Sequence, residues 1–261
     1  MGAPGVHACV VVTIDQSPAG LIGLFHDLGR ELSSHQRRLE AVTAVTELAV
    51  RRVPGTDWAS VSEGSGGTFT TTAATHEEAR AVDQIQYELD TGPCVDAILQ
   101  DTVFRTDDLR TDRRWPTFAE RATRTSATRS MLSFRLFLEG DDRIAGLNLY
   151  STRTGAFDEG SEVVGTLMAT HGALAVQAAA AREQAAQLQR ALLTSRDIGT
   201  AMGVLMAQHK VTRTEAFDLL RVASQTSNRK LADIAADVAD TGTLDLPGRW
   251  LDPRRASRNG R

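Results

Sequence analysis

A long stretch without a helix breaker dominates the second half of this 261-residue chain. Residues 158–209 contain no proline and are rich in alanine and leucine, which predicts nearly one continuous helix. At 1.5 Å per residue such a helix spans about 75 Å. An isolated helix of this length is not stable in water, so its apolar stripe needs a partner. The simplest partner is a second copy, and the sequence therefore predicts a homodimer through the long helix.

The stripe consists of apolar and small residues spaced by three and four positions. Its members are Val164, Leu167, Met168, His171, Leu174, Ala175, Ala178, Ala181, Ala185, Leu188, Leu192 and Ser195. Alanine buries little surface, so we expect the contact between the two helices to be weak and able to change register or break.

Residues 187–240 contain no proline and have the pattern of three amphipathic helices. Thr212 and Glu215 form a predicted capping box that begins the second helix. Ser227 or Asn228 is expected to cap the third helix.

Three helices of this size form a small unit with little core, so a partner surface is expected. Gly203, two residues after Ala201, is expected to allow another backbone to approach closely in the middle of the helix. The residues predicted to form the core are Ala201, Gly203, Leu205, Met206, Phe217, Leu220, Leu231 and Ala235.

These three helices carry a set of sequence blocks at fixed spacing. The blocks are SRDI at 195–198, AMGVLM at 201–206, EAF at 215–217, LR at 220–221, Ala223 and LADIA at 231–235. Together they resemble the ANTAR domain, an all-α three-helix domain. The resemblance implies binding of RNA hairpins in nascent transcripts and transcription antitermination. One departure is Met202, where the family commonly has lysine.

Charge is distributed unevenly along the chain, whose formal net charge is −4. From residue 187 onward there are 12 Lys and Arg against 8 Asp and Glu, while the preceding part holds 17 against 25. A basic rear and an acidic front suit a C-terminal part that meets a polyanion. The candidate RNA-binding residues are Arg196, Lys210, Arg213, Arg221, Arg229 and Lys230. Residues 247–261 are expected to form a basic disordered tail.

The front of the chain alternates helical and strand patterns in the order of an α+β domain with an antiparallel sheet. Helices are expected at 34–53, at 77–87 and after residues 93, 116 and 158; strands are expected at 58–62, 68–74, 103–106, 129–138 and 143–151, the last two joined as a hairpin by the turn at 140–142. Residues 1–33 form an N-terminal segment, partly disordered, with a short strand at 10–14 and a short helix at 19–32.

Three pieces of the front part are the most informative. They are YELDTGPCVDA at 87–97, Trp115-Pro116 followed by Phe118, and GLNLY at 146–150. They resemble the GAF domains that precede ANTAR domains in actinobacterial regulators. The expected organisation is thus a GAF sensor domain at 34–181, with flanking helices on its sheet, and an ANTAR domain with a helical linker at 182–246.

Chemistry in the GAF domain centres on Cys94, which follows Pro93 at a predicted helix N-terminus. A helix N-terminus favours thiolate, so a lowered pKa is one hypothesis, and it makes Cys94 a candidate signal site. One alternative function is therefore a redox or small-molecule enzyme. Some GAF domains have methionine-sulfoxide reductase activity, and this hypothesis includes that activity. The other interpretation of Cys94, which we favour, is a small buried cysteine beside a tight turn. Cys9 is the only other cysteine.

No cofactor or metal ion is expected, because His26, His76 and His171 have no co-ligands nearby in the sequence. A small-molecule ligand of unidentified class in the GAF domain stays open. So does a third reading, a DNA-binding regulator, although the third helix is acidic.

The chain shows no membrane or secretion signal. No continuous apolar run approaches about 18 residues, and the start lacks the basic segment of a signal peptide. A cytoplasmic regulator, not an enzyme, is the leading prediction.

Overall fold

The computed structural model describes residues 17–100, 103–136 and 144–245. The chain divides into two compact units, residues 1–183 and 184–261. One helix, α6 (Glu159–His209), contributes to both. The strand expected at 10–14, Cys9, the turn at 140–142 and the tail at 247–261 lie outside the described residues.

The first unit is built on a five-stranded antiparallel sheet in the order β2-β1-β5-β4-β3. The strands are β1 (Trp58–Ser65), β2 (Thr68–Ala74), β3 (Val103–Thr106), β4 (Ser130–Leu136) and β5 (Ile144–Ser151). β5 pairs with both β1 and β4, as the hairpin prediction requires for the last two strands. The GAF-type prediction of an antiparallel α+β domain is confirmed.

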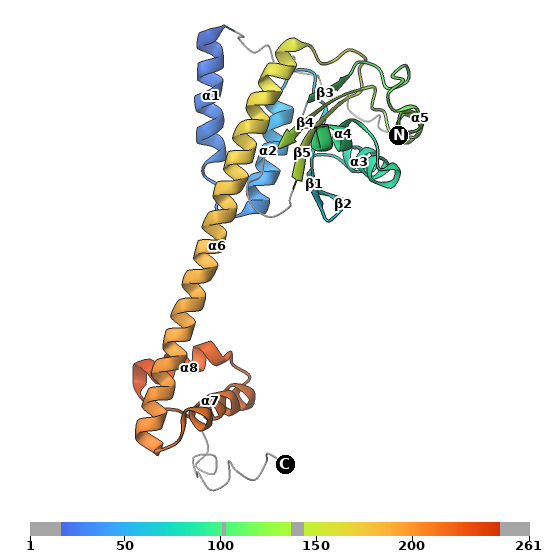
Figure 1. Cartoon of the computed structure of the whole chain (residues 1–261). Helices are drawn as coiled ribbons and strands as arrows, with labels where there is room; N and C mark the ends of the chain where they lie inside the picture. The colour runs from blue at the N-terminus through green and yellow to red at the C-terminus, as the bar shows by residue number, and fades with distance from the viewer. Residues whose placement is uncertain (1–16, 101–102, 137–143, 246–261) are drawn as a thin grey trace, which may run out of the picture. The chain divides into compact units, whose positions relative to one another are not determined.

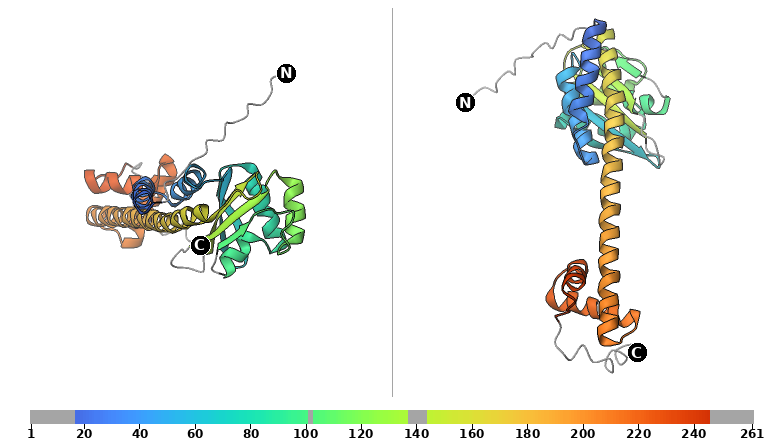
Figure 2. Two further views of the ribbon diagram at one scale, coloured as in Figure 1. Left: turned by 90° about the horizontal axis from the view of Figure 1, so that it is seen from above. Right: turned by 90° about the vertical axis from the view of Figure 1, so that its left-hand side faces the viewer.

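Helices cover both faces of this sheet (Figures 1 and 2). One face carries α2 (Arg38–Arg52) and the first part of α6, and α1 (Pro18–Leu32) packs against α2 on the side away from the sheet. The other carries α3 (Glu77–Leu89), α4 (Pro93–Gln100) and α5 (Pro116–Thr125).

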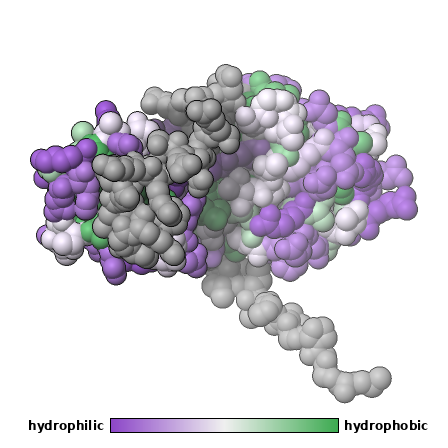
Figure 3. All heavy atoms as spheres, turned by 90° about the horizontal axis from the view of Figure 1, so that it is seen from below, coloured by the Kyte–Doolittle hydropathy of each residue, from purple (hydrophilic) through white to green (hydrophobic). Residues whose placement is uncertain are grey.

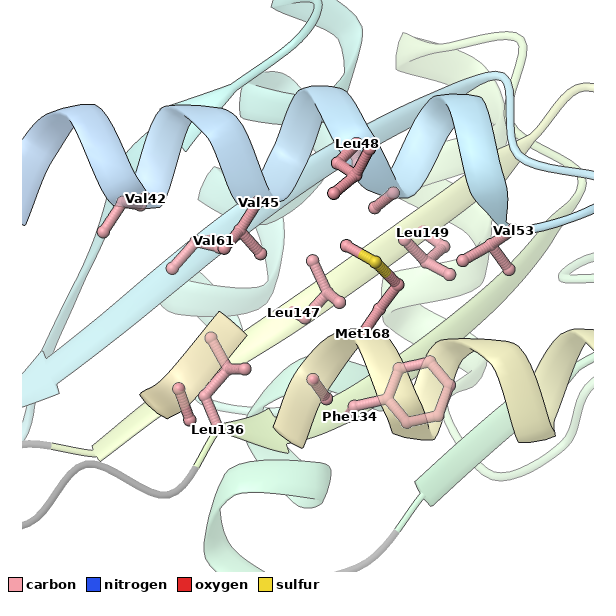
Figure 4. Packing of buried hydrophobic residues seen from close by; sticks show 14 of the residues in the cluster. Val42, Val45, Leu48, Val53, Val61, Phe134, Leu136, Leu147, Leu149 and Met168 are labelled. Carbon is pink, nitrogen blue, oxygen red and sulfur yellow. The ribbon is translucent and has the colours of Figure 1, made fainter. Parts of the chain in front are cut away.

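The core between this face of the sheet and the helices α2 and α6 is built mainly of aliphatic side chains (Figure 4). Val61 of β1 and Leu147 of β5 are paired neighbours that point toward Val45 of α2 and Met168 of α6. The helices lie close: a Cβ added at Gly172 would be 3.0 Å from the Val45 side chain. Because successive side chains of a strand point to opposite faces, the aliphatic residues of these strands lie together on this face of the sheet.

The N-terminal helix α1 belongs to this core. Ser17 caps it, accepting a hydrogen bond from the Gly20 backbone N–H at 3.1 Å. Its residues Leu24, Leu28 and Leu32 are buried in the same cluster as the sheet.

The composition of α6 corrects one expectation from the sequence. Within the described residues it alone has the length and apolar content of a membrane-crossing helix. Residues 163–181 indeed contain no Asp, Glu, Lys or Arg, so the apolar run is longer than predicted. The core helix of a soluble protein passes the same test, and Val164, Met168 and Ala179 are buried in the first unit.

The second unit contains the end of α6, α7 (Arg213–Ser227) and α8 (Leu231–Thr241). Thr212 and Glu215 form the expected capping box, with the Thr212 backbone N–H donating to Glu215 Oε2 at 2.8 Å. The prediction that Ser227 or Asn228 caps the third helix is wrong. Asn228 instead ends α7 in the left-handed conformation, and Lys230 precedes α8 without a side-chain cap.

The core of this unit is smaller than the sequence predicted. Ala201, Leu205, Leu220 and Ala235 are fully buried, and Leu231 is half-buried. Met206, Phe217 and Gly203 were also expected inside, but all three are exposed, and a Cβ added at Gly203 would meet nothing within 4 Å.

Helix geometry explains the difference. Successive residues are separated by about 100°, so Met206 and Phe217 lie a quarter turn or more beyond the buried Leu205 and Ala216. Leu192, near the end of the stripe expected on the long helix, is also exposed, at 62%.

Candidate functional site

A cluster of buried polar side chains lies on the second face of the sheet, beneath α3 and α4. Strand alternation places polar residues here, opposite the aliphatic ones. The members are Ser60, Ser62, Thr71, Asp83, Tyr87, Cys94, Asn148 and Tyr150.

Asp83 is the centre of the cluster and is completely buried. Its carboxylate accepts hydrogen bonds from the Tyr150 hydroxyl, from Thr71 Oγ1 at 2.8 Å and from Asn148 Nδ2 at 3.2 Å. Burial raises the pKa of Asp83 to about 6, because desolvation of the charged form outweighs these stabilising donors.

Cys94 touches the same network and does not have the properties of a reactive thiol. Its side chain is fully buried, and Asn148 Nδ2 donates to Sγ at 3.0 Å. Burial, followed by the nearby charge of Asp83, raises the pKa of Cys94 to about 12. The hypothesis of a lowered pKa is therefore wrong, because desolvation dominates at the N-terminus of the eight-residue helix α4, and the interpretation as a small buried cysteine is confirmed.

Two polar atoms of this region are buried without a hydrogen-bond partner among the described residues, Asn148 Oδ1 and Gln86 Nε2. The Gln86 side chain is held from its other end, where Oε1 accepts the Cys94 backbone N–H at 2.8 Å. Gly92 makes this possible: its φ is +146°, and a Cβ there would lie 2.5 Å from Gln86 Oε1.

The histidines of the first unit have structural contacts. His76 caps α3 and stacks on Trp58 at 5.1 Å, and His171 packs edge-on against Phe25 at 4.3 Å. In the part of the chain that the structure describes, no three His, Cys, Asp or Glu side chains are grouped as metal ligands.

Sequence reasoning missed the cluster around Asp83. A signal for it was present, since Ser60 and Ser62 alternate with aliphatic residues in a strand, as do Asn148 and Tyr150. Only the pairing of Ser60 with Asn148 brings the two sets together.

The cationic candidates occur at exposed positions of the second unit. Arg196 is on α6, Arg213 and Arg221 are on α7, and Lys210, Arg229 and Lys230 lie in the connecting turns.

Two of these cations have acidic neighbours. Arg221 pairs with Asp218 at 2.9 Å and Arg229 pairs with Asp237 at 2.7 Å. The other four form no ion pair within residues 17–245 as described. Exposed ion pairs contribute at most about 1 kcal/mol, so a phosphate can replace these carboxylates at low cost.

Met202 occupies the position at which the sequence departs from its relatives. Its side chain is largely buried against the core of the second unit. In this chain the position serves packing and does not present a charge.

Comparison with known families agrees with the division of the chain into two units at residues 183 and 184. The family model of the ANTAR domain matches residues 186–238, and that of the GAF domain matches residues 10–177, more than half of the chain. The chain belongs to the GAF family and carries an ANTAR domain. The pair indicates a regulator with a GAF sensor and an RNA-binding ANTAR domain that acts in antitermination.

Solved structures similar to the chain include several GAF proteins. The phytochrome photosensory core module of Stigmatella aurantiaca is 12% identical with a TM-score of 0.51, over 86% of this chain and 47% of that one. The GAF domain of a phosphoenolpyruvate-protein phosphotransferase from Coxiella burnetii is 13% identical, with a TM-score of 0.49, over 63% of this chain and 96% of that one.

A free methionine-R-sulfoxide reductase from Neisseria meningitidis is 12% identical, with a TM-score of 0.45, over 64% of this chain and 94% of that one. At these identities the likeness concerns the fold alone. No curated protein matches the chain.

Proposed function

We propose that the protein binds RNA hairpins in nascent transcripts as a dimer, through the exposed cations of its ANTAR domain, and that its GAF domain controls this binding. The observation that carries the proposal is the ANTAR match over residues 186–238, within which all six candidate cations fall. We assign the GAF sensor to residues 34–181, with its core completed by the helix α1 of the N-terminal segment at 1–33. We assign the ANTAR domain with its linker to 182–246, followed by a basic tail at 247–261.

Recognition of a hairpin rests on its loop. Bases in an RNA loop are unstacked and available, whereas the grooves of an RNA helix are poorly read by side chains. Arginine can contact both the backbone and the bases of such a loop, because its guanidinium group binds phosphate and stacks on bases. A hairpin held by the protein then competes with a terminator hairpin, and transcription continues.

Dimer formation is supported by an exposed stripe on α6. Leu188, Leu192, Gly199 and Met206 follow one another at intervals of four and seven residues, which places them on one side of the helix. The three large members are exposed, and a Cβ added at Gly199 meets nothing within 4 Å. A second copy covering this stripe places two ANTAR domains together, and thus two loops are bound at a fixed separation.

Control by the GAF domain has a physical route in α6, because the same helix packs in the GAF core and forms part of the ANTAR core. A change in the GAF domain that moves α6 alters the seam between the two copies. No membrane or cofactor is part of this proposal, and the site of action is the cytoplasm.

The proposal is tested with stem-loop RNA. Arg196→Glu or Arg229→Glu should each weaken binding at least tenfold, equivalent to about 1.4 kcal/mol, in fluorescence anisotropy titrations. Binding should also weaken with salt, by about 0.7 log units per log unit of salt for each single-strand phosphate contact.

Arg124→Glu is the matched control, because its side chain is 80% exposed but lies on α5 of the GAF domain. It should bind RNA as the wild type does. Absence of binding by the folded wild type, or unchanged binding by both ANTAR variants, would refute the proposal.

Neither alternative function is favoured by the structure. The enzyme reading needs an accessible, ionised Cys94, whereas this thiol is buried and its pKa is raised. The DNA reading needs a basic recognition helix, whereas α8 carries Asp233, Asp237 and Asp240. Duplex DNA of matched length, titrated beside the stem-loop, separates DNA binding from RNA binding.

A further inference from the structure

Phe217, on α7, is one of two aromatic residues (Phe, Tyr or Trp) in the described parts of the chain whose side chains are exposed; the other is Phe25 of α1. Phe217 is 40% exposed, although its neighbours Ala216 and Leu220 are completely buried. It is also the only Phe, Tyr or Trp between residues 186 and 245. A single exposed apolar side chain is common in soluble proteins, so the exposure of Phe217 by itself indicates no partner, and its charged surroundings carry the argument.

The surroundings of Phe217 are cationic. Arg213 lies four residues before it and Arg221 four residues after it, so both are one turn away on the same side of α7. Both arginines are exposed. The ring thus lies between two guanidinium groups along the helix axis.

The acidic residues of α7 lie elsewhere. Glu215 is about 160° around the helix from Phe217, and its carboxylate is held by Thr212 in the capping box. Asp218 is about 100° away and is paired with Arg221 at 2.9 Å. The surface beside the ring therefore favours an anionic partner that also offers a flat apolar face.

An RNA loop base fits this surface better than a protein does. A protein interface over Phe217 would have to desolvate Arg213, for which the described residues provide no acidic partner, and this is costly. The exposed stripe of α6, in contrast, carries Leu188 and Leu192. Hydrophilic residues cover most of the surface visible in Figure 3, and hydrophobic residues form small separate spots.

We propose that Phe217 is a stacking platform for one unpaired base of the bound RNA loop, with Arg213 and Arg221 contacting the phosphates on either side. This inference rests on the proposed RNA-binding function and assigns a specific role within it. The base stacks on the ring face while the arginines hold the backbone that leads into and out of it.

The test compares variants that separate the aromatic face from apolar bulk. Phe217→Leu should weaken stem-loop binding by about five- to 150-fold, the range expected for loss of one base–aromatic stack. Phe217→Tyr keeps the ring and should bind within about threefold of the wild type. Leu193→Ala is the matched control, since Leu193 is 52% exposed on α6.

RNA containing single abasic sites identifies the stacked base. At one loop position the abasic RNA should lose affinity for the wild type but bind Phe217→Leu with no further loss. A 2-aminopurine placed at that position should be quenched when the wild type binds. Stacking on a neighbouring RNA base also quenches 2-aminopurine, so the quenching should be kept in Phe217→Tyr and lost in Phe217→Leu, or in the equally non-aromatic Phe217→Met if Phe217→Leu does not fold.

The failures are distinguishable. The stacking role would be overturned if Phe217→Leu bound the stem-loop with wild-type affinity. It would also be overturned if Phe217→Leu weakened binding by the same factor for intact RNA and for every abasic RNA. If Arg196→Glu still weakens binding in that case, the RNA-binding function stands. If the folded wild type binds no stem-loop, the proposed function itself fails.

Discussion

Replacing Asp83 with asparagine should remove a pH dependence from the stability of the GAF domain. The Asp83 carboxyl is buried among Tyr150, Tyr87, Thr71 and Asn148, and no cationic side chain hydrogen-bonds to it in the described structure. The tyrosine hydroxyls have raised pKa values and stay neutral in the physiological range. Asparagine retains the size and one acceptor oxygen but does not ionise.

The sign follows from proton binding. Folding raises the pKa of Asp83 from its ordinary 3.8 to about 6, so between these values the folded state binds more protons than the unfolded state. Stability therefore falls as pH rises through this range. Each pKa unit corresponds to 1.36 kcal/mol, so the full effect is about 3 kcal/mol. About 2 kcal/mol of it is expected between pH 4.5 and 7.5, because the unfolded aspartate is already largely ionised at pH 4.5.

Urea unfolding at a series of pH values measures the effect. Trp58 and Trp115 belong to the GAF domain, and Trp250→Phe in all proteins limits the fluorescence signal to them. The free energy of unfolding of the wild type minus that of Asp83→Asn should fall by about 2 kcal/mol from pH 4.5 to 7.5.

Other carboxylates change stability equally in both proteins and cancel in this difference. Among them are Asp112 and Asp158, whose hydrogen bonds lower their pKa values and thus act in the opposite direction. Asp107→Asn is the control for charge removal, because the Asp107 side chain is 65% exposed. A pH-independent difference for Asp83→Asn, or one that rises with pH, would refute the assignment of desolvation as the dominant cause.

Two further predictions concern α6. Gly165→Ala should lower the melting temperature by about 2–10 °C, because the added Cβ would lie 2.3 Å from the Phe134 ring, and overpacking typically costs about 1–3 kcal/mol; Gly23→Ala in α1, with nothing within 4 Å, should not lower it. Light scattering at micromolar concentration should show a dimer that Leu192→Glu converts to monomer, since Leu192 is 62% exposed on the proposed seam. Equal melting of the two glycine variants, or a monomeric wild type, would contradict the respective argument.

Features that depend on a few neighbouring residues were predicted from the sequence. The capping box of Thr212 and Glu215 is a contact between residues three apart, so its signature is local. The turn into α4 at Pro93 and the absence of breakers in α6 are local in the same way. The alternation of the strands is equally local, and it indicated the α+β class.

The site in the GAF domain was not predicted because its parts are distant in the chain. Ser60 and Asn148 are 88 residues apart and meet only because β1 pairs with β5. Local sequence suggested that the helix end at Cys94 lowers its pKa. The packed sheet places that thiol in a dry environment near a carboxylate, and the sign of the shift reverses.

The amino-acid sequence alone indicated the elements, because periodicity and capping are properties of short stretches, and its sequence blocks resembled those of two known families. The tertiary structure decided which side of each element faces solvent. Periodicity defines a stripe only to within a residue or so, and a shift of one residue turns a helical side chain by about 100°. That rotation places Phe217 outside the ANTAR core, where the sequence pattern had placed it inside.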